Sequence, residues 1–189
     1  MPEPTLFGIG KEQWQLINSF APWLSAIGTL SAVVVSLWLS RRGAPKARLT
    51  VGLRIIVGPG SEEPYPEFIV FRIVNEGERP LRITQIGWRW GVWRKQYAVQ
   101  LFEDAISSKL PVDLAHGQEA QWFVPTQFED EPWSEHFCKA LMPDFRENAY
   151  TLRAQVFSSV GKAFEAKPEQ ALVDRLLDAG HTLEQRQQS

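Results

Sequence analysis

The side chains best suited to acid–base or nucleophilic chemistry in this chain are three histidines and a single cysteine. His136 and Cys138 form the one close pair of a base and a thiol, a combination that can generate a reactive thiolate. Two residues apart on a helix they would point to different faces and would not share a proton, whereas on a strand they would share one face. We expect Cys138 to be a small, partly buried apolar residue, and His116 and His181 to be solvated.

Other motifs of catalysis or cofactor binding are absent from the sequence. The acidic run Glu129-Asp130-Glu131 could bind a divalent cation or a basic partner, but it has no recognisable spacing of metal ligands. No glycine-rich phosphate loop leads into a lysine and a helix, and no Gly-x-Ser-x-Gly nucleophile elbow is present. We therefore predict that the protein is not an enzyme and uses neither a cofactor nor a metal.

The densest group of potential binding side chains combines tryptophans with basic residues. The candidate binding surface is Trp88, Arg89, Trp90, Trp93, Arg94 and Lys95. Tryptophan and arginine anchor well-packed contacts between proteins, and aromatic and basic side chains together also contact anionic lipids or stack on bases. Alternatively, Trp88 and Trp90 share one face of a strand and fill the core, while the basic residues are solvated. With a net charge of −2, no nucleic acid is expected as a partner.

The most apolar part of the chain lies near its N-terminus. No charged residue occurs from Gln13 to Ser40, and the apolar centre runs over Phe20–Leu39. Twenty helical residues rise about 30 Å, which is the thickness of the hydrocarbon core of a bilayer. The pattern predicts one transmembrane helix over residues 20–40. A buried core helix is rarely so long without a charge, and a cleaved signal peptide has a basic start and a shorter apolar region.

The flanks of this helix predict its orientation. Lys11 precedes it, and five basic residues follow before the first acid: Arg41, Arg42, Lys46, Arg48 and Arg54. Basic flanks remain in the cytoplasm, so we predict an inner-membrane protein with its N-terminus outside and its C-terminal domain in the cytoplasm. The opposite orientation would make that domain an outward-facing envelope module. Trp23 and Trp38, with Arg41 and Arg42, should lie at the two membrane interfaces.

Small residues recur at every fourth position of this helix. Gly28, Ala32 and Ser36 would line one stripe, along which the backbones of two helices can approach closely. We expect this stripe to mediate helix self-association or contact with a partner's span. The alternative is chance, because small residues are common in membrane spans.

After Arg42 the sequence changes to short runs of β-branched and aromatic residues separated by turn signals. The expected strands are 48–57, 67–74, 81–90, 96–102, 119–124, 149–158 and 162–166. The apolar phase shifts between Ile83 and Ile86, which predicts a bulge. Residues 128–132 are expected to form a loop and 133–142 a short helix. Pro168 is suited to the start of a C-terminal helix that ends near Ala179, before Gly180.

Six or seven short strands without long helices between them predict an antiparallel β-sandwich, with an open barrel as the alternative. The expected organisation is an N-terminal tail (1–19), a transmembrane helix (20–40), a basic connector (41–47), a β-sandwich domain (48–166), and a C-terminal helix and tail (167–189). A domain of this size buries enough surface to fold without a disulfide or a metal.

Three local patterns together resemble a known group of proteins. They are Val74–Leu81, Leu110–Gln118 followed by Trp122, and Ser158–Lys162. They resemble a loose group of small bacterial proteins that often carry one N-terminal span and an immunoglobulin-like β domain. The resemblance covers residues 68–166 and implies an immunoglobulin-like fold and a bacterial source. The group has no assigned activity, so the resemblance implies no functional residue, and Gln118 and Ser158 stand where acidic residues would be expected.

These features favour a membrane-tethered, non-catalytic interaction module. Its cytoplasmic β domain would recruit a protein partner through the tryptophan and arginine segment or through an exposed strand edge. The alternative is a membrane-anchored sensor-effector, of the defence or stress type, whose span self-associates. The expected partners are the lipid bilayer and either another protein or further copies of the chain.

Overall fold

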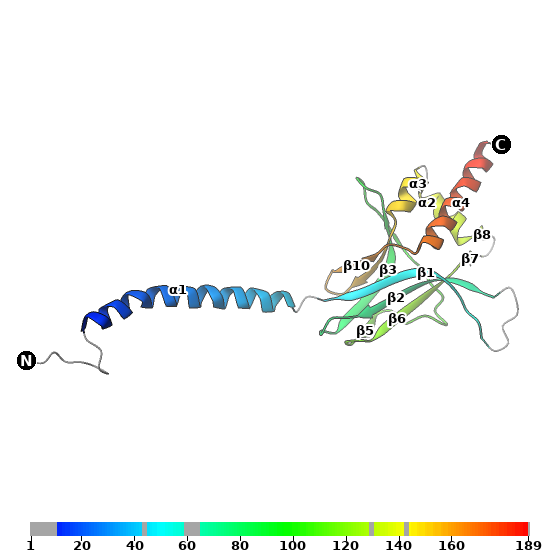
Figure 1. Ribbon diagram of the computed structural model, residues 1–189. Coiled ribbons are helices and arrows are strands. Elements are labelled where there is room, and N and C mark those ends of the chain that lie inside the picture. The colour runs from blue at the N-terminus through cyan, green and yellow to red at the C-terminus, as the bar shows by residue number, and fades with distance from the viewer. Residues whose placement is uncertain (1–10, 43–44, 59–64, 129–130, 142–143, 189) are drawn as a thin grey trace, which may run out of the picture. The chain divides into compact units, whose positions relative to one another are not determined.

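The computed structural model describes residues 11–42, 45–58, 65–128, 131–141 and 144–188. The chain divides into two compact units, Met1–Ala44 and Pro45–Ser189. Figure 1 shows the helix of the first unit and the strands and helices of the second, which we call the β unit.

The first unit consists of the long helix α1, Lys11–Arg42. Within it, the 21 residues Ser19–Leu39 have a mean hydropathy of 1.7, and none of this segment is buried. By length and composition this segment is apolar enough to cross a membrane. The helix begins before the predicted span and contains Pro22 in its interior.

The β unit is built on two antiparallel sheets. The three-stranded sheet has the order β1-β2-β6. Its strands are β1 (Ala47–Ile55), β2 (Glu67–Asn75) and β6 (Glu119–Pro125). The mainly β, antiparallel class predicted from the sequence is therefore confirmed.

The five-stranded sheet has the order β10-β9-β3-β4, and β5 pairs with the start of β3. Its strands are β3 (Leu81–Trp90), β4 (Gln96–Val99), β5 (Val112–Leu114), β9 (Arg153–Ser158) and β10 (Ala163–Ala166). The pairing of β3 with β9 shifts between Ile83 and Gln85, which confirms the predicted bulge. A small hairpin is formed by β7 (Gln127–Phe128) and β8 (Glu131–Pro132) where a loop was expected.

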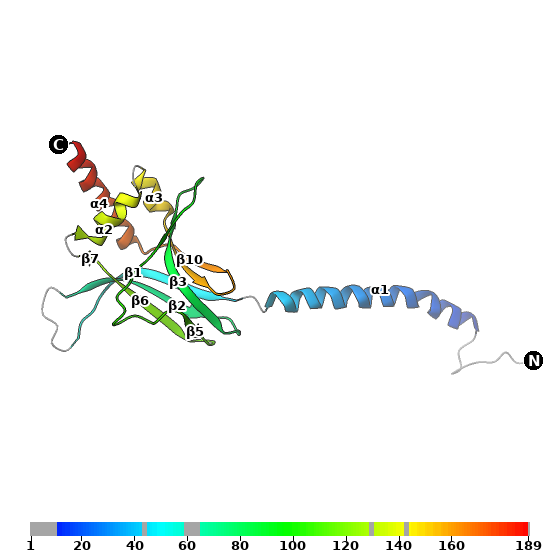
Figure 2. The same ribbon diagram turned by 180° about the vertical axis from the view of Figure 1, so that it is seen from behind.

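Three helices pack together at one end of the sheets, as both views show (Figures 1 and 2). They are α2 (Trp133–Leu141), α3 (Phe145–Thr151) and α4 (Gln170–Gln188). The predicted strand over 149–158 is wrong at its start, because Phe145 and Ala149 lie four residues apart on the buried face of α3. The predicted helix end near Ala179 is also wrong. Gly180 lies inside α4, and its lack of a side chain leaves room for the ring of Phe145, with which a Cβ would collide.

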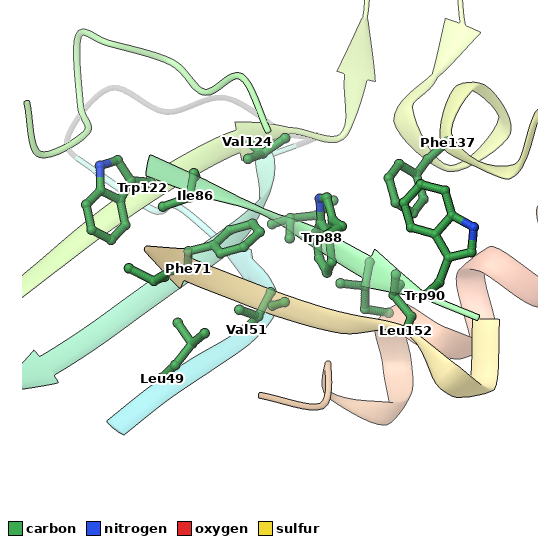
Figure 3. Close-up of a cluster of buried hydrophobic side chains, with 14 of the residues drawn as sticks. Leu49, Val51, Phe71, Ile86, Trp88, Trp90, Trp122, Val124, Phe137 and Leu152 are labelled. Atoms are coloured by element: carbon green, nitrogen blue, oxygen red, sulfur yellow. The ribbon is translucent and has the colours of Figure 1, made fainter. Parts of the chain in front are cut away.

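The core lies where the side chains of both sheets meet. Phe71 from β2 and Trp88 from β3 contact edge to face, with ring centroids 4.8 Å apart. Trp133 and Phe137 from α2 stack on each other at 4.7 Å and cover Trp88 from the helical side. Figure 3 shows Phe71, Trp88 and Phe137 in this cluster. The same cluster includes Leu172 and Leu176, so α4 is part of this core.

Candidate protein-binding edge at strand β4

The two tryptophans of β3 lie in the core. Trp88 and Trp90 are 0% and 4% exposed, because their shared face of β3 is directed at α2 and the three-stranded sheet. The indole N–H of Trp88 donates a hydrogen bond to Oε1 of Gln100 at 2.6 Å. Of the two alternatives for these residues, burial in the core is the one that the structure shows, and neither can form part of a binding surface.

Arg89 points to the opposite face of β3 and fixes β10. Its Nε and Nη2 donate to the two carboxylate oxygens of Glu165 at 3.1 and 2.6 Å. This two-point pair, assisted by Gln155, holds the pKa of Glu165 below its usual value. Arg89 is only partly exposed and is already engaged, so it contributes to the sheet rather than to a free surface.

The remaining predicted residues form the turn between β3 and β4. Trp93 is 95% exposed, and Arg94 and Lys95 are exposed beside it. Gly91 permits this turn because its φ is +86°, and a Cβ there would collide with the carbonyl oxygen of Arg94. Its N–H donates to Oγ1 of Thr151 at 3.1 Å, which fixes the turn against α3. The structure therefore leaves Trp93, Arg94 and Lys95 at the surface.

Strand β4 forms an edge of the five-stranded sheet. It pairs with β3 in the register Gly87 to Val99 and Arg89 to Tyr97, and the N–H of Gln100 donates to the carbonyl of Ile86 at 3.1 Å. Backbone groups alternate in direction along an antiparallel strand, so Ala98 and Gln100 face β3. The N–H and C=O groups of Tyr97 and Val99 therefore point away from the sheet.

These outward groups have no backbone partner within the described ranges of the chain. The outer edge of β6, by contrast, is closed by the segment that follows β4. The N–H groups of Glu103 and Ser108 donate to the carbonyls of Phe123 and Gln121, each at 2.8 Å. At β1, the carbonyl of Val51 accepts a hydrogen bond from the N–H of Glu169 at 2.9 Å. β4 thus offers an open edge, whereas these two edges are at least partly covered.

Exposed apolar side chains accompany this open edge. Tyr97, Val99 and Leu101 are 61%, 62% and 78% exposed and alternate along the strand and its continuation. Among the described residues of the β unit, six of eleven exposed large hydrophobic side chains lie in this region: Val92, Trp93, Tyr97, Val99, Leu101 and Ile106. Two of the six, Tyr97 and Val99, lie on β4 itself, and the others lie in the segments directly before and after it. Exposed apolar side chains that gather in one region are typical of an interaction site. We call Gln96–Leu101 the β4 edge.

A pocket of about 250 Å³ opens beside the β4 edge. One wall is formed by residues 98–101, and the other by Phe128, His136, Phe137 and Ala140. Its lining is mainly apolar, so it can accept an apolar side chain from a strand added to β4. Sequence reasoning placed a weak strand here but missed Tyr97, Val99 and Leu101 as site residues; their alternating apolar pattern was the available signal.

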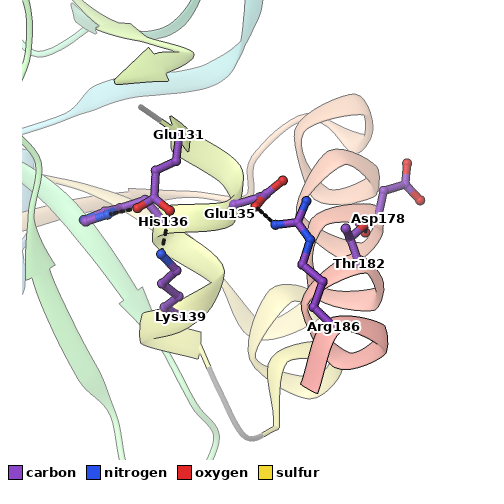
Figure 4. A network of polar contacts seen from close by, with 7 residues as sticks. All are labelled: Glu131, Glu135, His136, Lys139, Asp178, Thr182 and Arg186. Carbon is purple, nitrogen blue, oxygen red and sulfur yellow. Dashed lines mark hydrogen bonds and ion pairs between the residues drawn. The ribbon is translucent and has the colours of Figure 1, made fainter. Parts of the chain in front are cut away.

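The histidine and cysteine of α2 are separated by the helix. His136 is exposed and its Nδ1 lies 2.7 Å from Oε1 of Glu131, while Nζ of Lys139 donates to the other carboxylate oxygen, Oε2, at 2.5 Å (Figure 4). The pKa of Glu131 is lowered by both contacts, and the hydrogen bond from Lys139 has the larger effect. Cys138 is buried, and its Sγ donates to the carbonyl of Leu176 at 3.0 Å. Burial raises the pKa of this thiol to about 12, so it is not poised as a nucleophile.

The other candidate residues for chemistry remain apart. His116 and His181 are exposed, as expected. Within the described ranges no three His, Cys, Asp or Glu side chains are close enough together to hold a metal. Glu129 and Asp130 of the acidic run lie outside the described residues.

On α1, the small residues Gly28, Ala32 and Ser36 are exposed along the helix. Trp23 and Trp38 are exposed near the two ends of the 21-residue apolar segment. Arg41 and Arg42 belong to the last turn of α1, and their side chains lie outside what the structure describes. All these residues keep the helical spacing on which their predicted roles depend.

Comparison with known proteins gives no family. No protein-family model matches the chain, and no curated protein matches it. Among solved structures, a candidate ApaA protein from Bordetella pertussis is 16% identical in sequence, with a TM-score of 0.28. The match covers 65% of this chain and 87% of that chain. A likeness at this TM-score carries no argument about fold or function.

Proposed function

We propose that the protein is a membrane-tethered, non-catalytic interaction module that binds an extended segment of a protein partner at the β4 edge. One observation carries the proposal: the outward backbone groups of Tyr97 and Val99 have no backbone partner among the described residues and lie beside exposed apolar side chains. A strand added to such an edge forms main-chain hydrogen bonds, and its alternate side chains supply specificity. The pocket beside residues 98–101 would receive one of these side chains.

The tether in this proposal is α1. Its segment Ser19–Leu39 is inserted in the inner membrane of a bacterial cell, and the basic residues that follow keep the β unit in the cytoplasm. A reporter fused to the C-terminus tests this orientation. When the C-terminal fusion partner is a protein that fluoresces only in the cytosol, we expect fluorescence. When it is an enzyme that is active only outside the cytosol, we expect no enzyme activity. The opposite pattern would place the β unit in the envelope.

We further propose that the two sheets form an immunoglobulin-like sandwich. The support is that both sheets are antiparallel and that inward-facing residues of β2 and β3, such as Phe71 and Trp88, meet in one core. In such a fold the sheet edges are solvent-accessible unless loops cover them, which makes β4 available for strand addition.

A second candidate is the sensor-effector, in which α1 self-associates. The exposed stripe of Gly28, Ala32 and Ser36 favours it, because small residues let two helices approach closely. A Cβ at Gly28 would meet no other atom of the chain within 4 Å, so a larger side chain there would disturb only the packing of a second helix. Growth arrest on overexpression that Gly28→Leu abolishes would support this function. Harmless overexpression would count against it.

The test of strand addition is site-specific cross-linking in the full chain in its membrane. A benzophenone amino acid replaces Tyr97 in one version and Val160, an exposed residue of the β9–β10 turn, in the control. We expect a cross-linked adduct from position 97 and none from position 160. Val99→Pro should abolish the adduct, since it removes one outward N–H and leaves the inward groups of Ala98 and Gln100 on β3. Equal adducts at both positions, or an adduct that persists with Val99→Pro, would contradict the proposal.

A further inference from the structure

We infer that the end of the β unit at which the chain enters from α1 is a binding surface for the phosphate groups of anionic lipids. This surface, which we call the entry end, consists of the start of β1 and three turns: 45–48, 76–80, 115–118 and 159–162. The inference rests on the tether of the proposed function, because α1 must be inserted in a membrane to bring the entry end to the lipid. Two observations carry it: the short connection to α1 and the excess of positive charge.

Hydrogen bonds join two of the turns to the start of β1. The carbonyl of Lys46 accepts from the N–H groups of Glu76 and Gly77 at 3.0 and 2.9 Å. Nζ of Lys162 donates to the carbonyl of Pro45. Both views show these turns at the end of the β unit where β1 begins (Figures 1 and 2). The turns at 76–80 and 159–162 therefore lie directly beside the point where the chain enters.

The buried side chain of Asn75 fixes the remaining turn. Its Nδ2 donates to the carbonyls of Arg79 and Leu114 at 2.9 and 2.8 Å, and its Oδ1 accepts from the N–H of Gly77 at 2.9 Å. The backbone carbonyl of Asn75 also accepts from the N–H of Gly117 at 2.8 Å. The turn at 115–118 is thus tied to the turn at 76–80, and the entry end is one continuous surface.

The connection to α1 is too short to hold the entry end far from a bilayer. α1 ends at Arg42, three residues after Leu39, the last residue of its apolar segment. Three helical residues rise about 4.5 Å. Consecutive Cα atoms are about 3.8 Å apart, so the Cα of Pro45 lies at most about 11 Å from that of Arg42. Because the headgroup layer on each side of a bilayer is about 5–8 Å thick, the start of β1 lies at the headgroups or just beyond them when α1 is inserted.

The entry end offers more positive than negative charge to a ligand. Its charged side chains are all exposed. Arg48 is neutralised by Glu76, with Nε 2.7 Å from Oε1. Neither Lys46 nor Arg79 forms an ion pair with another residue in the described part of the chain. The charges that remain are three positive side chains and one negative one: Lys46, Arg79, Lys162 and Glu78. Lysine and arginine side chains close to a membrane surface are attracted to anionic headgroups.

The exposed turn between β3 and β4 lies at the other end of the β unit. β3 starts beside the entry end, since the N–H of Ser159 donates to the carbonyl of Arg82 at 2.9 Å. It ends at Trp90, and a strand of ten residues extends about 30 Å. Lipid contact at the entry end would therefore hold the turn at 91–95 away from the bilayer and leave its aromatic and basic side chains to a protein partner.

Quenching by headgroups in the full chain tests this inference. A fluorophore is attached at Ser159→Cys in the entry end or, as the control, at Trp93→Cys, while the buried Cys138 stays unlabelled. The vesicles are made of phosphatidylcholine with a nitroxide quencher on a fraction of the headgroups, with or without phosphatidylglycerol. We expect quenching at position 159 that rises with phosphatidylglycerol and falls in high salt. Quenching at position 93 should stay low in both kinds of vesicle.

Two pairs of neutralising substitutions separate this surface from general charge attraction. Lys46→Gln with Arg79→Gln removes two charges of the entry end, and each substitution should weaken the lipid contact by about fivefold. Arg94→Gln with Lys95→Gln removes the same charge from the turn between β3 and β4, and should leave quenching at position 159 unchanged. All four side chains are exposed, and an unchanged circular dichroism spectrum shows that both variants fold.

Flotation with the vesicles in a density gradient distinguishes failure of this inference from failure of the tether. A chain that does not float has no tether, which overturns both. A chain that floats overturns lipid binding by the entry end alone if its quenching at position 159 does not respond to phosphatidylglycerol, or if the Lys46 and Arg79 variant is quenched as strongly as the wild type. Stronger quenching at position 93 than at position 159 would place the turn between β3 and β4 on the bilayer and would also overturn the inference.

Discussion

The indole N–H of Trp88 and the side-chain carbonyl of Gln100 form a 2.6 Å hydrogen bond inside the core. Gln100 directly follows β4, and its side-chain N–H also donates to the carbonyl of Leu101 at 2.7 Å. The bond therefore ties the end of β4 to the middle of β3. The open edge is thus held to β3 by a buried side-chain hydrogen bond as well as by its backbone pairing.

This bond should be important for stability. Gln100→Met keeps the length of the side chain but leaves the buried Trp88 N–H without a partner, and we expect a loss of about 1–3 kcal/mol in the free energy of unfolding. Urea denaturation followed by tryptophan fluorescence measures it. Gln96→Met is the matched control, because Gln96 is exposed on the same strand. Equal stability of the two variants would show that the bond contributes nothing.

The tryptophans of the β3–β4 segment should differ sharply in their effect on folding. Trp88→Ala removes a fully buried ring that contacts Phe71, Trp133 and Phe137, and should cost about 3–5 kcal/mol of unfolding free energy. Trp93→Ala should change it by less than about 0.5 kcal/mol because that ring is solvated. Chemical denaturation of both variants checks this. A large loss with Trp93→Ala would place that ring in the core.

Cys138 should be inert in the folded chain. With its pKa raised to about 12 by burial, the thiol stays protonated from pH 7 to 9, and the reactive thiolate is scarce. We expect alkylation by N-ethylmaleimide to be slow in buffer and complete after denaturation. Since the folded pKa lies above the ordinary value of 9.0, this group favours folding below about pH 9 and loses that contribution as the pH rises further. Rapid labelling of the native chain would contradict its burial.

The Arg89–Glu165 pair should make the free energy of unfolding depend weakly on pH in the acid range. The pKa of Glu165 is lowered by Arg89, so the pair stabilises the fold above the ordinary carboxyl pKa of 4.5 and loses this effect as the pH falls. Glu165→Gln should cost less than about 1 kcal/mol at pH 7, because the carboxylate is partly exposed. In denaturation series the difference from the wild type should shrink as the pH falls below 4.5 and the carboxylate becomes protonated. A difference that does not shrink in acid would point to a role other than charge.

Local patterns in the sequence predicted much of the β unit. Alternating apolar residues located β1, and the change of phase after Ile83 located the bulge in β3. The same alternation put Trp88 and Trp90 on one face, but it could not decide whether that face is core or surface. That choice depends on α2, whose Phe137 covers both rings from a distant part of the sequence.

The candidate site depends on strand order, which local patterns do not contain. β4 is the last strand in the order β10-β9-β3-β4. That order is set by the pairing of β3 with β9, which lies more than fifty residues away in the chain. The start of the predicted strand at Ala149 failed for a related reason: Ala149 packs in the core from α3, and Gly180 of α4 admits the neighbouring Phe145. Such contacts between remote segments override local β propensity.

The proposed function depends most on two peptide groups, the N–H of Tyr97 and the N–H of Val99. Amide hydrogen exchange in the full chain, reconstituted at one copy per lipid nanodisc, measures their state directly. We expect both amides to exchange at least tenfold faster than those of Ala98 and Gln100, which face β3. If Tyr97 and Val99 exchange as slowly as Ala98 and Gln100 in single-copy discs, the β4 edge is already covered and cannot accept a partner strand.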